Sequence, residues 1–332
     1  MSTIAIGRPG RLTPCPVCRG RRYERVWRDL PELRFGLRER FSVWRCPDCG
    51  THVTDPQPDQ EYLDRLYQAH YVPAEYVPPN REAIAACVAG LRGGQDALLR
   101  QWRRENSTDI PALFYDPTIG RYFRDCSSVL DVGAYAGENM LWLQAGGWRV
   151  SGVEPNPQAA RLALQFGLDV RVSSLEDSRL PPASFDAVYL SYVIEHLLDP
   201  RAMLAELWRI LKPGGRLLLT THNVESLWRY VFGPYWINWH TPFHLYHFSV
   251  RSLGRLAEES GFRALYLGSR TPVFWLLLSF RAARDSLLRG QPNLRLWDRM
   301  TDTVNRRLLR WLRLERGRGR GDCTIAIFER AA

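Results

Sequence analysis

From Ser128 onward, apolar positions follow two alternating spacings along the chain. Short runs of β-branched and apolar residues predict buried strands, and longer segments with apolar residues three and four positions apart predict amphipathic helices. Strands that alternate with helices predict an α/β fold, a mainly parallel sheet with helices on both faces. The runs expected to form strands are SVLDV, RVSGVE, DVRV, FDAVYLS, RLLLTT, RALYLG and, near the C-terminus, CTIAIFE.

Helices are expected between these strands, for example in PQAARLALQFG and SVRSLGRLAEESG. Two further helical segments, ENMLWLQAGG and PRAMLAELWRILKPGG, end in a glycine pair, where we expect the helix to stop. Upstream, residues 59–125 have mostly helical spacing, in EYLDRLYQAHY, REAIAACVAGLR and DALLRQWRREN. We expect this lead-in to pack on the sheet domain, which extends over residues 126–332.

Glycine and acidic residues stand where the predicted strands end. In open parallel sheets, ligands bind outside the carboxyl ends of the strands. Asp131 and Gly133 close the first strand, and Glu154 ends the second, where a carboxylate is placed to accept both hydroxyls of a ribose. The loop reads DxGxxxG, whereas dinucleotide-binding proteins have GxGxxG, so the pattern favours a ligand without a pyrophosphate.

Residues 1–58 carry two CxxC pairs separated by 27 residues, each with proline after its first cysteine. Two such turns bring four thiolates together in a tetrahedral set, which closes the coordination of a structural zinc ion. Disulfides and a redox CxxC are the alternatives. The segments YERVWRD and RFSVWRC read as short strands that lead to and from the metal turns, so residues 1–58 are expected to form a zinc ribbon. The predicted ligands are Cys15, Cys18, Cys46 and Cys49.

Charge and composition add little about partners. The net charge is +10, and 12 arginines against four acidic residues fall between Arg281 and Arg320. Because Lys212 is the only lysine, this excess is as readily explained by compositional bias toward arginine as by selection for phosphate contacts. The chain starts without the apolar core of a secretory signal, and its longest apolar run, PVFWLLLSF, is about half of a bilayer span. We therefore expect a cytoplasmic protein.

Four segments in order, VLDVGAYAG, VSGVEPNP, LPPASFDAVYLSYVIEHLLDP and ILKPGGRLLLTT, resemble the successive motifs of class I S-adenosylmethionine-dependent methyltransferases. The resemblance implies a Rossmann-like seven-stranded sheet, with GDCTIAIFER as its last strand. It also implies S-adenosyl-L-methionine as the cofactor. The glycine loop would lie against the methionine part, the acid after the second strand would bind the ribose, and the next two strand ends would approach the adenine and the methionyl end. The residues that match these positions are Asp131, Gly133, Ala134, Gly137, Glu154, Pro155, Leu175, Glu176 and Ser191.

Tyr135 departs from this resemblance, because the family most often has glycine at its position. A tyrosine is tolerated there if the backbone is extended or right-handed. Since Asp131 and Glu154 are both present, we expect a working cofactor site.

The acceptor side is expected where histidines gather. Methyl transfer requires a base that removes a proton from the acceptor, and four of the seven histidines fall between residues 222 and 247 among aromatic residues. The segment FHLYHFS resembles one in methyltransferases of sugar and polysaccharide pathways, including deoxysugar C-methyltransferases with an N-terminal zinc module. That resemblance implies His244 as the base, and His222 is a second candidate. Phe243 replaces the acid of that motif, and the cluster could instead hold its loop by hydrogen bonds.

A helical insertion is expected at about residues 271–316, before the last strand. Trp297, Met300, Val304, Leu308 and Trp311 recur at helical spacing, with arginines on other faces. Such a basic amphipathic hairpin could rest peripherally on the inner membrane face, cover a lipid-linked acceptor, or pack as a plain helical cap.

The sequence therefore predicts O-methylation of a sugar, glycan, lipid-linked or other small-molecule acceptor. The alternatives are an RNA methyltransferase with a zinc module, a deoxysugar C-methyltransferase, and a non-catalytic scaffold with the same fold. A nucleic-acid substrate is disfavoured, because SYVIEH stands where an amide-proline-aromatic motif would follow the fourth strand.

Overall fold

The computed structural model describes residues 12–71, 80–92, 111–287 and 319–331 of the 332-residue chain. The chain divides into two compact units. The first unit comprises residues 1–59, 220–256 and 266–326, and the second comprises residues 60–219, 257–265 and 327–332. Residues 1–59, which carry the cysteine pairs, thus belong to the same unit as the segment that carries four of the histidines.

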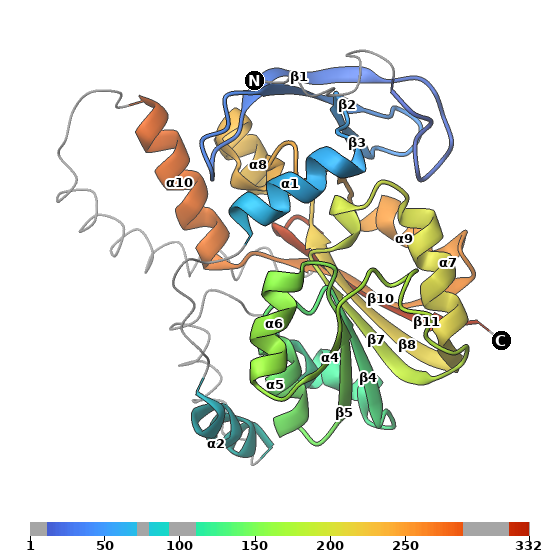
Figure 1. Cartoon of the computed structure of the whole chain (residues 1–332). Helices are drawn as coiled ribbons and strands as arrows, with labels where there is room; N and C mark the ends of the chain where they lie inside the picture. The colour runs from blue at the N-terminus through green and yellow to red at the C-terminus, as the bar shows by residue number, and fades with distance from the viewer. Residues whose placement is uncertain (1–11, 72–79, 93–110, 288–318, 332) are drawn as a thin grey trace. The chain divides into compact units, whose positions relative to one another are not determined.

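The seven-stranded sheet has the order β10-β11-β8-β7-β4-β5-β6 (Figure 1). Strand β4 pairs in parallel with β5 on one side and β7 on the other, and β5 pairs in parallel with β6. All five residues of β4 are buried, as the apolar run SVLDV predicted. The predicted seven-stranded α/β sheet is therefore confirmed. Its strands are β4 (Ser128–Val132), β5 (Arg149–Val153), β6 (Asp169–Arg171), β7 (Phe185–Ser191), β8 (Leu211–His222), β10 (Phe262–Arg270) and β11 (Cys323–Arg330).

Two of the helices that follow the strands, α6 and α7, begin at polar caps. The side chain of Asn156 accepts backbone N–H bonds from Gln158 and Ala159 at the start of α6, and Asp199 does the same at the start of α7. The sequence also placed the end of α7 at its glycine pair, which is wrong. Helix α7 ends at Ile210, and the segment LKPGG already belongs to β8. The bounds are α5 (Glu138–Ala145), α6 (Pro157–Gln165), α7 (Pro200–Ile210) and α9 (Val250–Glu258).

The first unit contains a four-stranded sheet in the order β1-β2-β3-β9. Strands β1 (Glu24–Pro31) and β2 (Arg40–Arg45) were predicted, whereas β3 (His52–Asp55) and β9 (Tyr246–His247) were not. Strand β9 is two residues long and pairs antiparallel with β3, so no local pattern announces it. A hydrophobic core of aromatic and aliphatic side chains packs in the same unit, and two of its tryptophans, Trp236 and Trp239, are at most 1% exposed.

The remaining elements include the predicted lead-in. Helices α1 (Gln60–His70) and α2 (Arg81–Arg92) form where the spacing predicted them. The third predicted lead-in helix, in residues 96–106, and the amphipathic segment at 294–314 lie outside the described residues. The other elements are η1 (Pro111–Tyr115), α4 (Pro117–Gly120), η2 (Arg121–Phe123), η3 (Ile194–His196), α8 (Leu227–Phe232), η4 (Gly233–Tyr235), η5 (Ile237–Trp239) and α10 (Val273–Leu287).

Candidate functional site

Asp131 is the most unusual side chain at the carboxyl edge of the sheet. It is fully buried in β4, and within the described part of the chain neither of its carboxylate oxygens has a hydrogen-bond partner. Burial, followed by the charge of Glu154, raises the pKa of Asp131 to about 8. A buried carboxylate without a partner is costly, so this position fits a ligand that supplies a positive charge or donors.

The loop after β4 is shaped to let backbone atoms come close. Gly133 has φ +75°, and a Cβ atom there would lie 2.7 Å from Cγ2 of Val193, which precedes η3. The N–H groups of Gly133 and Ala134 donate to the carbonyl oxygen of Val153 at 2.9 and 3.1 Å, which ties the loop to the end of β5. Gly137, with φ +83°, is the N-cap of α5. The loop therefore brings the ends of β4 and β5 together with η3.

Tyr135 adopts a left-handed backbone with φ +49°. The condition under which a tyrosine was expected to be tolerated here, an extended or right-handed backbone, is therefore not met. A non-glycine residue in this region costs on the order of 1 kcal/mol. The strain accompanies a specific contact, because the N–H of Tyr135 donates to Oε2 of Glu154 at 2.9 Å. A tyrosine thus occupies a glycine-like conformation in which its own backbone holds the predicted ribose acid.

Glu154, at the end of β5, is held on both oxygens. Besides the bond from Tyr135, its Oε1 accepts the N–H of Asn156 at 2.8 Å. The side chain is buried with 7% exposure, and burial raises its pKa against these two hydrogen bonds. The two backbone bonds orient the carboxylate at the tip of the strand, where ribose hydroxyls could be accepted by the remaining lone pairs.

The other predicted cofactor residues lie in the same unit, after the ends of β5, β6 and β7. Pro155 follows Glu154 directly. Leu175 is 2% exposed, whereas Glu176 beside it is exposed. Ser191 is the last residue of β7 and is half-buried. The structure thus places them at or after three strand ends, and their contacts with a cofactor stay a prediction.

Tyr67 is a site residue that the sequence did not reveal. It lies on α1, which we expected only to pack on the sheet domain. Its hydroxyl is 2.7 Å from Nδ1 of His196 in η3, and the two rings meet edge to face with centroids 5.9 Å apart. Burial, followed by nearby charges that include Glu195 and Glu154, raises the pKa of Tyr67 well above its usual range. Only the spacing of α1, which sends Leu63, Leu66 and Tyr67 to one face, hints at this role.

The four predicted zinc ligands come together in the first unit. Their sulfur atoms all lie within 4.8 Å of one another. The sulfur atoms of Cys15 and Cys49 are 3.4 Å apart, as are those of Cys18 and Cys46. These separations are close to the edge of about 3.8 Å of a tetrahedron with zinc–sulfur bonds of about 2.3 Å. The four cysteines are free thiols, so the donor set fits a tetrahedral zinc ion.

The two turns around these cysteines are equivalent. The N–H of Arg19 donates to the carbonyl of Cys15 at 2.8 Å, and the N–H of Gly50 donates to that of Cys46 at 2.9 Å. Both closing residues have positive φ, +60° and +78°. Each CxxC is therefore built as the same tight loop, as expected for paired metal turns.

The histidine cluster of the first unit is buried and internally bonded. Nε2 of His222 lies 2.9 Å from Nδ1 of His247, whose Nε2 lies 3.2 Å from the hydroxyl of Thr54. Nδ1 of His244 donates to the carbonyl of Asn238 at 2.8 Å, which fixes its tautomer. Burial, followed by the charge of His222, lowers the pKa of His247 well below its usual range. These hydrogen bonds fit the alternative in which the histidines hold their loop in place at least as well as they fit a catalytic base.

The same cluster does not suit a metal ion, although its nitrogens lie within 4.8 Å of one another. The rings of His222 and His244 stack with centroids 4.5 Å apart and an angle of 4° between their planes. Imidazole lone pairs lie in the ring plane, so two stacked rings cannot direct them to one ion.

A comparison with protein families decides the family of this chain. A family profile described as methyltransferase domain matches residues 95–267, slightly more than half of the chain. The chain belongs to this methyltransferase family. The carboxyl-edge residues Asp131, Gly133 and Glu154 all fall inside the matched region.

Curated relatives cover only parts of this methyltransferase. The ubiquinone biosynthesis O-methyltransferase of Xanthomonas oryzae pv. oryzae is 39% identical over 105 residues, which is 29% of this chain and 43% of the relative. The protein of the same name from Xanthomonas campestris pv. campestris is 36% identical over 139 residues, or 38% of this chain and 58% of the relative. The chain thus spans about half the length of these relatives.

One solved structure is similar to this chain at lower sequence identity. The 1,6-didemethyltoxoflavin-N1-methyltransferase of Burkholderia thailandensis, with bound 1,6-didemethyltoxoflavin and S-adenosylhomocysteine, is 17% identical, with a TM-score of 0.43. The match covers 79% of this chain and 94% of that chain.

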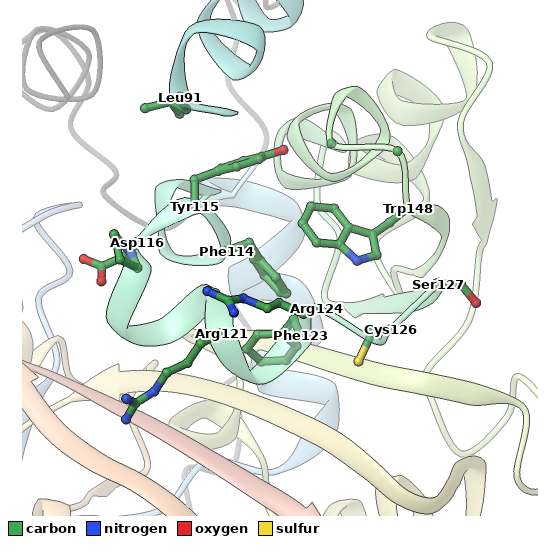
Figure 2. Close-up of a pocket in the computed structure, with 14 residues that line it drawn as sticks. Leu91, Phe114, Tyr115, Asp116, Arg121, Phe123, Arg124, Cys126, Ser127 and Trp148 are labelled. Carbon is green, nitrogen blue, oxygen red and sulfur yellow. The ribbon is translucent and has the colours of Figure 1, made fainter. Parts of the chain in front are cut away.

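A hollow of about 550 Å³ lies at the other edge of the methyltransferase sheet (Figure 2). Its lining includes Ser127 and Trp148, which precede β4 and β5, together with Phe114 and Arg121. Because β4 and β5 are parallel, these residues lie at the opposite ends of the strands from Asp131 and Glu154. The hollow is therefore separate from the predicted cofactor site.

The described helices also bear on membrane contact. None of the helices in the described ranges is long and apolar enough to cross a membrane.

Proposed function

We propose that this chain transfers a methyl group from S-adenosylmethionine to a hydroxyl of a sugar, glycan, lipid-linked or other small-molecule acceptor. The observation that carries the proposal is the buried carboxylate of Asp131, which has no hydrogen-bond partner among the described residues, beside the oriented carboxylate of Glu154 in a methyltransferase-family chain. Together they fit a ligand with a positive charge and a ribose.

The residues at the carboxyl edge would each contact a different part of the cofactor. Glu154 would accept the ribose hydroxyls, and Asp131 and the loop from Gly133 to Gly137 would lie along the methionine part. Leu175, Glu176 and Ser191 would approach the adenine and the methionyl end. When bound, the sulfonium supplies the methyl group as an electrophile.

A hydroxyl acceptor is favoured over other classes by the relatives named O-methyltransferase. A hydroxyl loses its proton as it attacks, so a base within reach supplies part of the rate. The sequence predicts His244 and His222 for this role. The structure adds His196, which belongs to the same unit as Asp131 and Glu154.

Binding is tested by isothermal titration with S-adenosylhomocysteine. We expect saturable binding to the purified chain and a loss of about tenfold or more for Asp131→Asn, because the ligand then lacks a charged partner. The matched control is Asp125→Asn, the same chemical change at an exposed residue before β4. Absence of binding by the unmodified chain would support the non-catalytic scaffold and refute the proposal.

The acceptor class is tested by transfer of tritium from labelled S-adenosylmethionine. Extracted glycolipids and glycans, polar small-molecule extract and total RNA are offered separately. Label in the glycan, lipid or small-molecule fraction supports the proposal, whereas label in RNA alone would support the RNA alternative. A methyl group that survives on carbon after degradation would identify the C-methyltransferase alternative.

We also propose that Cys15, Cys18, Cys46 and Cys49 bind one structural zinc ion. The close approach of the four sulfur atoms and the paired turns support this assignment. Elemental analysis should find about one zinc per chain, and Cys46→Ser should lose it, whereas Cys87→Ser on α2 should not. Equal zinc in both variants would contradict the assignment.

Peripheral contact with a membrane through the arginine-rich insertion stays a proposal, since residues 288–318 lie outside the described ranges. Vesicles that contain anionic lipid should then retain the chain more than neutral vesicles do, and the difference should fall as salt rises.

A further inference from the structure

Helix α1 and the turn η3 meet through one polar contact. The hydroxyl of Tyr67 and Nδ1 of His196 are 2.7 Å apart, a distance typical of a strong hydrogen bond. The ring of Tyr71, one turn further along α1, lies edge to face with the same imidazole at 6.5 Å between centroids. Two aromatic residues of one helix therefore fix the plane of His196, and the hydroxyl of Tyr67 meets its Nδ1.

This pair lies beside the residues expected to hold the cofactor. Val193 begins the turn that carries His196, and it approaches Gly133 so closely that a Cβ at Gly133 would clash with it. Tyr67 is within electrostatic reach of Glu195 and Glu154. The pair, the glycine loop and the ribose acid all belong to the second unit.

The other histidines considered for this role differ in their surroundings. Nε2 of His222 is bonded to a neighbouring imidazole, and Nδ1 of His244 is bonded to a backbone carbonyl in a cluster at most 4% exposed. His196 is half-buried, and its Nδ1 meets the hydroxyl of Tyr67, which can either donate or accept a proton.

We propose that His196 is the general base that takes the acceptor's proton, and that Tyr67 is the residue that positions it. This inference rests on the proposed methyl transfer to a hydroxyl. With Nδ1–H directed at the oxygen of Tyr67, the imidazole presents Nε2 to the acceptor. His196 is then the catalytic residue, and Tyr67 acts through it.

The step balances as a single displacement. The acceptor oxygen forms a bond to the methyl carbon, the bond between that carbon and sulfur breaks with its electron pair going to sulfur, and the hydroxyl proton passes to Nε2 of His196. The imidazolium that results is stabilised by its Nδ1–H bond to the phenol oxygen and later returns the proton to solvent.

Several ionisable groups surround the imidazole. Glu195 is its neighbour in η3, Tyr67 and Tyr71 face it from α1, and Glu154 at the end of β5 acts on Tyr67. Burial and these carboxylates raise the pKa of Tyr67, so the phenol stays neutral across the physiological range and can accept the Nδ1–H bond.

The first test needs no acceptor. Nitrogen-15 NMR of histidine-labelled protein with S-adenosylhomocysteine should show the Nδ1–H tautomer for His196, and Tyr67→Phe should change it toward the mixture of free imidazole. Tyr71→Phe is the matched control, since it removes a hydroxyl from the same helix face. An Nε2–H tautomer that is unaffected by Tyr67→Phe would overturn the positioning role.

The second test uses tritium transfer into whichever extract fraction accepts label from the unmodified chain. His196→Ala should lower the rate by about 100-fold or more, with S-adenosylhomocysteine affinity unchanged, and added imidazole should restore part of it. Tyr67→Phe should lower kcat by about tenfold with KM for S-adenosylmethionine unchanged. If His196 had only a structural role, added imidazole would not restore the activity of His196→Ala.

The failures are distinguishable. If the unmodified chain labels no fraction, the proposed function fails and the base role fails with it. If it does transfer, and His244→Ala rather than His196→Ala loses activity and recovers with imidazole, the sequence-based choice of His244 is correct and our inference is wrong.

Discussion

Two buried aspartates, one in each compact unit, show how differently this chain treats the same side chain. Asp322, in the first unit, accepts bonds on Oδ1 from the hydroxyl of Ser226 and from Nε1 of Trp236, the latter at 2.9 Å, and on Oδ2 from Nδ2 of Asn238 at 3.4 Å. Asp131, in the second unit, is equally inaccessible and has no donor on either oxygen among the described residues.

The difference separates architecture from function. A buried carboxylate surrounded by donors fixes the segments that supply them, here α8 through its N-cap Ser226 and the turns η4 and η5. A buried carboxylate without donors lowers the stability of the ligand-free protein and persists in a fold when something else compensates it. Asp322 therefore holds the first unit together, and Asp131 marks where a ligand is expected.

The largest expected effect is a loss of stability in the first unit, which contains both Asp322 and the four cysteines. Removal of zinc by a chelator should unfold the ribbon formed by β1 to β3, because binding to a structural four-cysteine site contributes on the order of 10 kcal/mol. Circular dichroism during thermal unfolding, with and without chelator, measures the loss. If the melting curve is the same before and after the chelator removes the zinc, the ribbon does not need zinc for its stability.

Next in size is the direct exchange of the two aspartates for asparagine. Asp322→Asn should lower the free energy of unfolding by about 2 kcal/mol, because one oxygen becomes an NH₂ group that faces donors. Asp131→Asn should not lower it at pH 7, because the unmodified protein has by then lost most of the stability that the bound proton contributes. Chemical denaturation of both variants measures the two changes in the free energy of unfolding. Equal losses would show that the two aspartates do not differ in the way we describe.

The pH dependence sharpens the contrast further. The pKa of Asp131, about 8, lies above its ordinary value of 3.8, so the folded protein binds a proton that the unfolded chain has released. Stability contributed by this proton is present at low pH and is lost as the pH rises toward 8. Relative to Asp131→Asn, the unmodified ligand-free protein should therefore lose stability progressively between about pH 4 and pH 8 and stay level above. If the free energy of unfolding changes with pH in the same way in both proteins, Asp131 does not bind this proton in the folded state.

The smallest expected effect is at Tyr135. Tyr135→Gly should relieve backbone strain of about 1 kcal/mol, partly offset by the greater freedom of glycine in the unfolded chain. Affinity for S-adenosylhomocysteine should stay nearly unchanged, because the N–H that bonds Glu154 is retained. A large gain in affinity by titration would mean that the tyrosine ring partly blocks the natural site.

The sequence alone determined the order of strands and helices, the seven-stranded sheet and the family. Those features depend on local periodicity and on motifs whose residues are near neighbours in the chain, such as Asp131 with Gly133 and the two CxxC pairs. Because parallel strands end at one edge, residues after successive strands could be expected together before their contacts were known.

Only the tertiary structure decided which polar groups have partners. The DxGxxxG loop marked Asp131 as a candidate, but no local pattern showed that the donors of Asp322 lie more than 80 residues away or that the oxygens of Asp131 have none among the described residues. The same limit hid the contact between Tyr67 and His196, which are separated by 129 residues, and the two-residue strand β9. Hydrogen bonding and burial depend on proximity in space, so the sequence could name candidate side chains but not their surroundings.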